Sequence, residues 1–358
     1  MKRIILVALT ILLISAVIFG GCGGPAEEAT TTPSESEVKP IEWTFVSFIP
    51  PFDVYAMEAE SWAKRVEEAT GGRMKVTFYW AESLVKLTGL FEAVAAGTAD
   101  MAQHPLAPWP ERLSLTWVWF LPGIFDNTPQ TGKVLIALFN KYDDMQKQYF
   151  PAKVIWFQTP GPFELASKKP VRTMEDLKGL KIQTGMKSEM MAYEALGAVP
   201  VPVHVTEAYQ ALETGVVEAS SLDFNAVFIW RLHEVTKYRI GNTLGIMSGM
   251  PTIMNTESYN KLPADVKQKF DSVTDPLAYT NAANEAWLKF SADSIAQIKE
   301  YDKKVGNPDF YYLTAEEHAR WAEKIAPVRD DWVKENTARG FPAQAILDDA
   351  IAFAAQYK

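Results

Sequence analysis

Cysteine is almost absent from this chain. Cys22 is the only cysteine among 358 residues, so no internal disulfide can form. A chain of this length can still bury a large core and divide into two domains. Hydrophobic residues make up 48% of the sequence and charged residues 22%, which is the balance of an ordinary globular chain. We therefore expect a two-domain protein with no covalent cross-link.

The patterns that accompany catalysis and metal binding are missing as well. The histidines are His104, His204, His233 and His318, and none stands at ligand spacing from another histidine or from cysteine. There is no glycine-rich phosphate loop and no GxSxG nucleophile elbow. The sequence therefore predicts that the protein is not an enzyme and has no cofactor and no metal site.

Long basic runs are also lacking. The formal net charge is −9 at pH 7. A protein that binds nucleic acid needs clustered Lys and Arg, because neutralising phosphates releases counterions. We therefore expect no nucleic-acid partner.

The first 40 residues have the composition of an export signal followed by a linker. Lys2 and Arg3 precede an apolar run over residues 4–19, which is short for a transmembrane span of about 20 residues. Small residues and Cys22 follow, and this order resembles a bacterial lipoprotein processing site. It predicts a signal peptide at 1–21 and lipidation of Cys22, with a free thiol or an uncleaved anchor helix as the alternatives. Residues 22–40 are rich in Thr, Ser, Glu and Pro, so we expect a flexible tether.

The stretch 176–225 has the pattern of one α/β lobe. Residues 180–184 predict a strand, and residues 188–196 a helix that Gly197 ends. Pro200 and Pro202 keep the next segment extended, a second helix ends at Gly215, and residues 216–222 predict a buried strand. Open α/β sheets bind ligands at the carboxyl ends of their strands. We therefore expect a ligand site at that edge of the lobe.

Residues 41–103 predict a second βαβαβ lobe, which suggests a parallel sheet. Residues 90–100 (LFEAVAAGTAD) align with residues 208–218 (AYQALETGVVE) at a constant offset, so that Gly97 meets Gly215. This alignment is a repeated unit or a chance match, since a helix terminator before a short strand is common. Two such lobes would enclose a cleft, where ligands prefer to bind. Farther on, residues 263–305 predict one long helix with a kink at Pro276.

Several of these segments resemble the solute-binding proteins of TRAP (tripartite ATP-independent periplasmic) transporters, the DctP-like family. The similar runs are LKGLKI, ALGAVPVPV and EAYQALETGVVEA in the central stretch, with WAKRVEEATGGRMKVTFY, LFEAVAAGTADMAQ and LPGIF before it. Their order and spacing carry the resemblance from about Ile41 onward. It implies an α/β, two-lobed clamshell of the periplasmic-binding-protein type, with a long helix spanning both lobes. We expect lobe 1 at 41–157 and 246–290, and lobe 2 at 158–245 and 291–358.

At one position the chain departs from the resembled family. The residue after LKGLKI is usually an arginine that clamps a substrate carboxylate, and here it is Gln183. A neutral amide cannot replace a charged two-pronged donor, and a buried carboxylate without a partner costs several kcal/mol. Another cation could substitute (Arg112, Lys86, Arg172 and Lys187 are the candidates), or a metal ion, or the ligand is neutral or zwitterionic. The Glu-Trp pair of metal-bridged members corresponds here to Ser221 and Leu222, which does not support the metal.

The remaining candidates follow strand ends. Asp223 is either a ligand residue or the N-cap of the next helix. The predicted ligand-binding residues are Gln183, Phe48, Trp80, Gln103, Trp109, Phe163, Asp223 and Asn225.

The resemblance implies an extracytoplasmic, lipid-anchored receptor in the periplasm or on the outer face of the cell membrane. It would bind a small organic acid, with an aromatic or branched acid as one option, and deliver it to a TRAP membrane permease. The alternative is a receptor of the same fold for a neutral or zwitterionic solute, serving an ATP-driven importer or a signalling receptor. A lipoprotein hydrolase is a further rival, but no nucleophile and base pair supports it.

Overall fold

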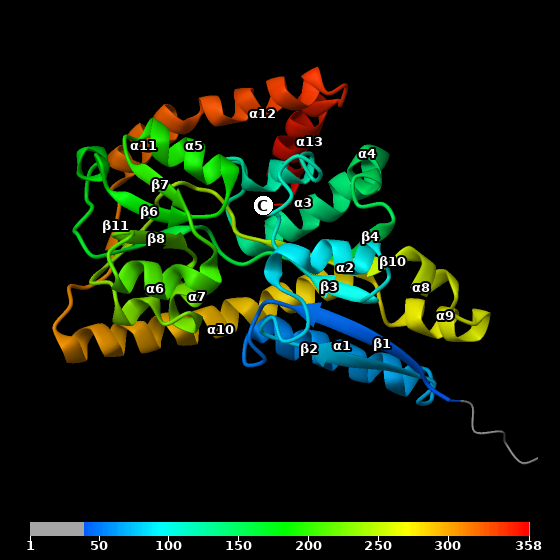
Figure 1. Cartoon of the computed structure of the whole chain (residues 1–358). Helices are drawn as coiled ribbons and strands as arrows, with labels where there is room; N and C mark the ends of the chain where they lie inside the picture. The colour runs from blue at the N-terminus through cyan, green and yellow to red at the C-terminus, as the bar shows by residue number, and fades with distance from the viewer. Residues whose placement is uncertain (1–38, 358) are drawn as a thin grey trace, which may run out of the picture. The chain divides into compact units, whose positions relative to one another are not determined.

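The computed structural model describes residues 39–357, so the predicted signal peptide, Cys22 and most of the predicted tether lie outside the described residues (Figure 1). The strands are β1 (Ile41–Ser47), β2 (Met74–Tyr79), β3 (Met101–Gln103), β4 (Ala152–Gln158), β5 (Glu164–Ser167), β6 (Lys181–Thr184), β7 (Val199–Pro202), β8 (Ala219–Leu222), β9 (Tyr238–Gly241), β10 (Met250–Asn255) and β11 (Tyr311–Tyr312). The α-helices are α1 (Val54–Ala69), α2 (Leu90–Ala95), α3 (Thr128–Lys141), α4 (Asp143–Lys147), α5 (Lys187–Ala195), α6 (Ala208–Glu213), α7 (Phe224–Ile229), α8 (Thr256–Asn260), α9 (Ala264–Ser272), α10 (Pro276–Val305), α11 (Ala315–Ile325), α12 (Pro327–Ala338) and α13 (Ala343–Gln356). Short 3₁₀ turns are η1 (Leu87–Gly89), η2 (Thr116–Phe120), η3 (Met174–Leu177), η4 (Val205–Glu207) and η5 (Leu232–Glu234).

The first sheet has the strand order β2-β1-β3-β10-β4. Strands β1, β2 and β3 are parallel, as their alternation with helices predicts, and β10 joins antiparallel to β3 and β4. Helix α1 buries one face that includes Tyr55, Trp62 and Val66. It is followed by Gly71 and Gly72, whose φ values of 63° and 78° glycine adopts without strain.

The second sheet has the order β11-β9-β5-β8-β6-β7. Strand β6 is parallel to both β7 and β8, which fits the βαβαβ pattern of the central stretch, whereas β5 is antiparallel to β8 and β9. Strand β7 lies at the edge, where Pro200 and Pro202 are tolerated because no neighbour needs their missing N–H groups. The carboxyl ends of the parallel strands β6 and β8 therefore lie side by side at the same end of this sheet.

Two chain crossings and one long helix join the two sheets. The crossing after β4 and the return before β10 run antiparallel: Phe163 N–H donates to Ile246 at 2.8 Å, and Ser248 N–H to Gly161 at 3.1 Å. Helix α10 contacts α3 and β4 of the first half and α7 of the second (Figure 1). The two-sheet α/β architecture with one long connecting helix confirms the predicted fold.

The predicted kink at Pro276 is wrong. Helix α9 ends at Ser272, and a separate helix starts at Pro276 with Asp275 as its N-cap. Proline is favoured at the first helical position, because its missing N–H would be unpaired there. Pro276 therefore begins the connecting helix.

The repeated unit has the same local structure in both places. Turn η1, helix α2, Gly97 and β3 correspond in order to turn η4, helix α6, Gly215 and β8. The two glycines have φ values of 71° and 79°. The acidic residue after each glycine also has the same role, since Asp100 accepts from the N–H of Thr44 and Glu218 from that of Lys181. The two segments therefore share more than a glycine that ends a helix.

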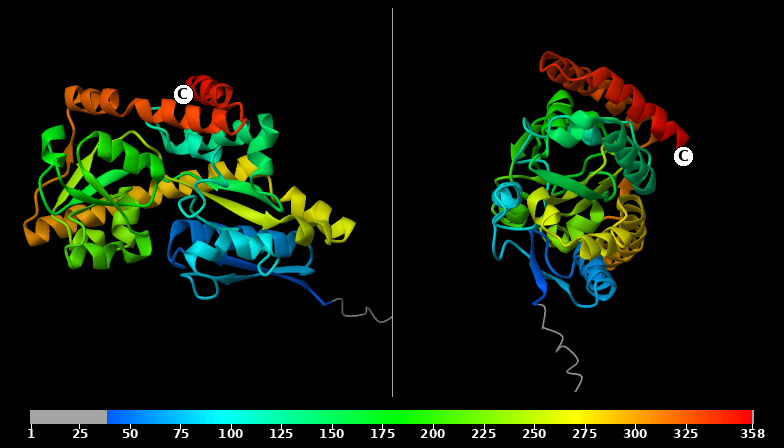
Figure 2. Two further views of the ribbon diagram at one scale, coloured as in Figure 1. Left: turned by 45° about the horizontal axis from the view of Figure 1, so that its top comes forward. Right: turned by 90° about the vertical axis from the view of Figure 1, so that its right-hand side faces the viewer.

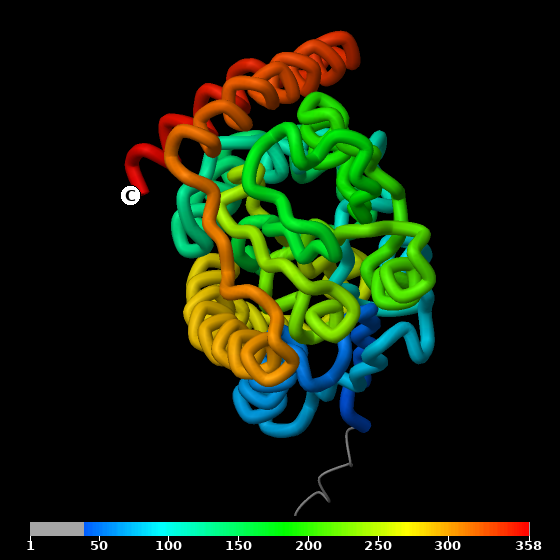
Figure 3. The backbone as a smooth tube through the Cα atoms, turned by 90° about the vertical axis from the view of Figure 1, so that its left-hand side faces the viewer, coloured from blue at the N-terminus to red at the C-terminus, as the bar shows by residue number. Residues whose placement is uncertain are grey.

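The last helices lie on the side away from β1 and β2, as the views in Figures 2 and 3 agree. Helix α12 contacts α5, and α13 packs against α3, where Gln130 Nε2 donates to Ala354 O at 2.7 Å. Residues 343–356 thus pack against the first half, although they belong to the segment assigned to lobe 2. The lobe boundaries stay a prediction. Of the helices within residues 39–357, none combines the length and apolar character that crossing a bilayer requires.

Candidate functional site

A cavity of about 120 Å³ lies between the two sheets. It is lined by residues that follow the carboxyl ends of β1, β3, β6, β7 and β8, by both crossings and by α10. Carboxyl ends of strands are where open α/β sheets hold ligands. An engineered apolar cavity of about 150 Å³ holds benzene, so this one suits a small molecule.

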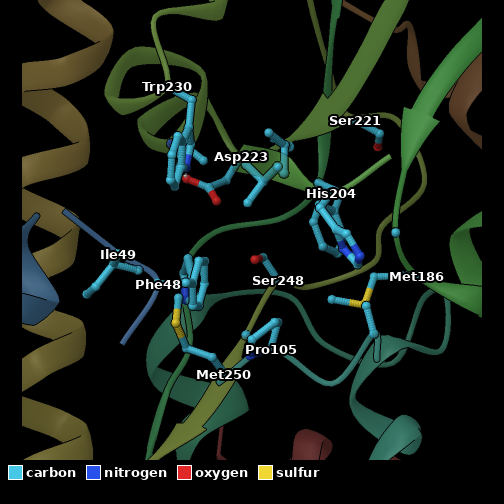
Figure 4. A pocket seen from close by; sticks show the side chains of 18 of the residues that line it. Phe48, Ile49, Pro105, Met186, His204, Ser221, Asp223, Trp230, Ser248 and Met250 are labelled. Carbon is cyan, nitrogen blue, oxygen red and sulfur yellow. Dashed lines mark hydrogen bonds between the residues drawn. The ribbon is translucent and has the colours of Figure 1, made fainter. Parts of the chain in front are cut away.

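Five of the eight predicted ligand residues line this cavity: Phe48, Phe163, Gln183, Asp223 and Asn225. They come from both sheets and from one crossing, so the fold brings them together from distant parts of the sequence. Figure 4 shows Phe48 and Asp223 facing the same space from opposite sides. These five remain our proposed ligand contacts.

The other three predicted residues do not line the cavity. Trp80 donates its indole N–H to Glu60 at 2.9 Å, and Trp109 donates to Glu92 at 2.6 Å. Gln103 is fully buried within β3. We therefore leave these three out of the proposed site.

The amide of Gln183 is engaged within its own half of the molecule. Its Nε2 donates to the carbonyl of Val203 at 2.8 Å, and its Oε1 accepts from the hydroxyl of Ser220 at 2.5 Å. A primary amide has two N–H donors, so one remains for a ligand. Gln183 thus braces β6 against its neighbours as well as lining the cavity.

Among residues 39–357, no lysine or arginine lines the cavity. The four cations considered as substitutes for an arginine clamp have partners elsewhere. Arg112 donates to Phe150 O at 2.6 Å, Lys86 pairs with Glu82, Arg172 lies over the ring of Tyr311, and Lys187 pairs with Glu335 at 2.6 Å.

Three carboxyl groups line the cavity instead, and two of them, Asp53 and Asp223, start helices in opposite halves. Asp53 caps α1 by accepting from Tyr55 N–H at 2.8 Å, and Asp223 caps α7 by accepting from Ala226 N–H at 3.0 Å. Asp223 is therefore the N-cap of α7, and its role as a ligand residue stays a prediction. Burial raises the pKa of Asp53 to about 6 and that of Asp223 to about 7, and the charge of Asp53 contributes to the latter.

Two further buried carboxyl groups belong to the second half. Glu189 lines the cavity and accepts from the hydroxyls of Thr184 and Ser221. Glu164, the first residue of β5, accepts from the backbone N–H of Thr243 at 3.3 Å. Burial raises the pKa of both glutamates to about 8, against these hydrogen bonds. Both oxygens of Glu189 are thus committed to the protein.

Most of the aromatic residues that line the cavity were not predicted from the sequence. Tyr55, Trp230 and Trp287 line the cavity, and the hydroxyl of Tyr55 and the indole N–H of Trp287 have no hydrogen-bond partner in the described structure. Buried Tyr and Trp usually pair these polar atoms, so the two donors are open to a ligand. No periodicity distinguishes Trp287 from the other aromatic residues of α10. Asp53 could have been found, because it follows a strand end and precedes a helix, as Asp223 does.

We expect Gly249→Ala to disturb the return crossing. A Cβ at Gly249 would lie 1.6 Å from Cζ2 of Trp119, a fully buried ring. Overpacking of this kind typically costs about 1–3 kcal/mol, and here the crossing must shift because the ring has no free space. Urea unfolding should show this loss, whereas Gly89→Ala, whose Cβ meets only Val85 at 3.5 Å, should stay within about 1 kcal/mol of the parent. Equal stability of the two variants would contradict the packing.

Residues 45–336 match the sequence family described as bacterial extracellular solute-binding protein, family 7 (DctP). The chain belongs to this family. Its members are extracytoplasmic proteins that bind small molecules.

Among the curated family relatives, the C4-dicarboxylate-binding periplasmic protein DctP of Rhodobacter capsulatus is 28% identical over 308 residues, covering 85% of this chain and 89% of the relative. A TRAP solute-binding protein of Desulfovibrio salexigens has 25% identity and a TM-score of 0.76 over 89% of this chain and 97% of its own. One from Rhodoferax ferrireducens, crystallised with copurified benzoate, has 22% identity and a TM-score of 0.81 over 88% of this chain and 98% of its own. The similarity to the Rhodoferax ferrireducens structure establishes that the two chains share a fold.

Proposed function

We propose that this family 7 protein is the lipid-anchored solute receptor of a TRAP-type transporter. It binds one small organic acid between its two halves and delivers it to the membrane permease. Lipidation of Cys22 would hold the folded part at the outer face of the cell membrane. No reaction is catalysed.

The cavity between the two sheets carries this proposal. Its walls come from both halves, so a ligand inside it contacts both at once. Two antiparallel crossings and α10 are the connections that a hinge closing on a ligand requires. Because such a ligand gains contacts only in the closed form, it shifts the equilibrium toward closure, which is the signal a permease can recognise.

Two observations support an organic acid as the solute. The relative from Rhodobacter capsulatus is named for a C4-dicarboxylate, and the structure from Rhodoferax ferrireducens holds benzoate. In this chain the open donors of Tyr55 and Trp287, together with the ring of His204, offer hydrogen bonds to a carboxylate. Phe48 and Trp230 supply apolar surface for the rest of the molecule.

We expect solute binding to change the tryptophan fluorescence. Trp230 and Trp287 line the cavity, so a ligand alters the surroundings of both rings. Titrating the exported domain, residues 39–358, with small organic acids should give a saturable change that Trp230→Phe together with Trp287→Phe removes. Trp43→Phe is the control, since Trp43 packs on Phe270 in the core and should leave the signal intact. A change that persists in the double variant would place the solute elsewhere.

The permease partnership is tested separately, by co-purification of the full-length chain with candidate membrane proteins. A TRAP permease is the expected partner. Recovery of an ATP-driven importer or of a signalling receptor would replace that part of the proposal while leaving the receptor role intact.

A further inference from the structure

The charges around the cavity do not match a simple carboxylic acid. Asp53, Glu189 and Asp223 line it, and no lysine or arginine within residues 39–357 does. A buried carboxylate that lacks a cation loses its hydration without regaining a charge partner. An acid entering this cavity would also meet the field of two carboxylates already present. An acid that carries its own positive charge would avoid both costs.

Asp53 and Asp223 are placed to receive such a charge. They start helices in opposite halves, and they are close enough for the charge of one to act on the other. Each uses Oδ1 to cap its helix, and a carboxylate accepts hydrogen bonds at both oxygens. In Figure 4 the Asp223 carboxylate points into the pocket beside Trp230 and toward Phe48. Aromatic faces attract cations, most strongly where water is excluded.

A second, independent feature favours a polar ligand in this cavity. Tyr55 and Trp287 are 1% and 5% exposed, line the same cavity, and have polar atoms without a partner in the part of the chain that the structure describes. Both groups are neutral donors, so they complement acceptor oxygens. The cavity thus holds acceptors for a cation and donors for an anion.

We propose that the solute is a zwitterion, an organic acid that also carries a protonated or quaternary nitrogen, and that Asp53 and Asp223 bind this nitrogen. The inference rests on the proposed receptor function and narrows its solute. The donors of Tyr55 and Trp287 serve the carboxylate end, and the aromatic wall covers the apolar part. Two acids on opposite halves sharing one cation also favour closure, because the cation holds both halves together.

Protonation of the two acids should control the affinity. Tyr55, Glu189 and His204 are the other titratable groups that line the cavity, and the charge of Asp223 acts on Glu164 in β5. As the pH rises from 5 to 8, Asp53 and Asp223 lose their protons, and the affinity for a cationic nitrogen should increase. A plain acid held by protonated aspartic acids would show the opposite trend.

The first test compares matched compounds by thermal shift and calorimetry on residues 39–358. The sets are leucine, 4-methylpentanoate and 3-methylbutylamine, then phenylalanine, 3-phenylpropanoate and 2-phenylethylamine, with trimethylglycine as a quaternary probe that does not titrate at its nitrogen. We expect binding only by compounds that carry the nitrogen, with affinity rising between pH 5 and 8. A nitrogen-free acid that binds as tightly as its amino counterpart would overturn the proposal.

The second test uses variants that separate binding from helix capping. Asn caps a helix as well as Asp does, so Asp53→Asn and Asp223→Asn should preserve the fold while removing the charge. Losing a hydrogen bond to a charged group should lower the affinity for the nitrogen compound about 10- to 150-fold in each variant. Asp275→Asn is the matched control, because Asp275 caps α10 at 2.6 Å from Ala278 N and does not line the cavity. Unchanged affinity in both cavity variants would refute the assignment of the nitrogen site.

The two levels of the proposal fail differently. If nitrogen-free acids bind and the asparagine variants bind them equally or better, the zwitterion is wrong and the receptor function stands. If no acid, amine or zwitterion in the sets binds, the proposed receptor of a small organic acid is itself contradicted.

Discussion

Raising the pH from 5 to 8.5 should lower the free energy of unfolding of the unliganded protein, and Glu189→Gln should remove a large part of that loss. Burial raises the pKa of Glu189 from 4.5 to about 8. The folded state therefore holds this proton more tightly than the unfolded chain does. The stabilisation is complete below the unfolded pKa and is lost as the pH rises through about 8. At about 1.36 kcal/mol for each pKa unit, the contribution is on the order of 5 kcal/mol.

The substitution Glu189→Gln would keep the shape of the side chain and leave it without charge at any pH. The new amide can satisfy the hydroxyls of Thr184 and Ser221, since a hydroxyl both donates and accepts. Urea unfolding at a series of pH values should thus give a flatter curve for Glu189→Gln than for the parent. Glu194→Gln, on the exposed side of the same helix, should leave the curve unchanged. Parallel curves for the parent and Glu189→Gln would contradict the prediction.

Asp53, Glu164 and Asp223 should contribute in the same direction, since burial raises the pKa of each. An unliganded site that gathers Asp53, Glu189 and Asp223, with Glu164 buried outside the cavity, loses stability at neutral pH. A cationic nitrogen between Asp53 and Asp223 favours their charged forms and so returns part of that stability when it binds. Asp53 and Asp223, which lower the stability of the unliganded protein, are thus the same residues that would select its solute.

The parallel parts of the two sheets were predictable, because they depend on local patterns. Strand and helix alternation indicated the parallel pairing, and the glycines after the helices marked the repeated unit. The resemblance placed Gln183 at the cavity. It did not reveal that the amide is held by Val203 and Ser220, since those contacts join segments that only the folded sheet brings together.

The aromatic part of the site was the least predictable. Trp80 follows a strand, as a ligand residue should, but β2 is the edge strand of the first sheet and its indole is tied to Glu60. Trp287 lies on a helix that the sequence marks only as long. Its ring reaches the cavity because Gly161 leaves room: a Cβ there would lie 2.5 Å from Cη2 of Trp287. Such close approaches between distant segments leave no periodic signal.

Removing the carboxylate of Asp302 should lower the free energy of unfolding by about 3–5 kcal/mol, because the buried guanidinium of Arg239 then has no opposite charge beside it. Arg239 has a fully buried side chain, Asp302 is 4% exposed, and their Nη2 and Oδ1 atoms are 3.0 Å apart. The pair attaches the far end of α10 to the second sheet, while Asn284, accepting from Thr159 N–H at 3.1 Å, attaches the same helix to the first crossing. Asp302→Ala should therefore loosen the link between α10 and the second half without altering any residue that lines the cavity.

Urea unfolding measures the total loss of unfolding free energy in Asp302→Ala. Hydrogen exchange of α10 and β9 shows whether these two elements lose protection. Asp144→Ala is the matched control, since its pair with Lys147 at 3.1 Å is exposed and such pairs contribute about 0–1 kcal/mol. Replacing both partners, Arg239→Met with Asp302→Leu, should cost less than Asp302→Ala alone, because no unpaired charge remains buried. If the double variant is the weaker one, hydrogen bonds from Arg239 to the backbone, such as that to His233 O at 2.8 Å, matter more than the ion pair. A loss below about 1 kcal/mol in Asp302→Ala would show that α10 does not need this attachment to connect the two halves.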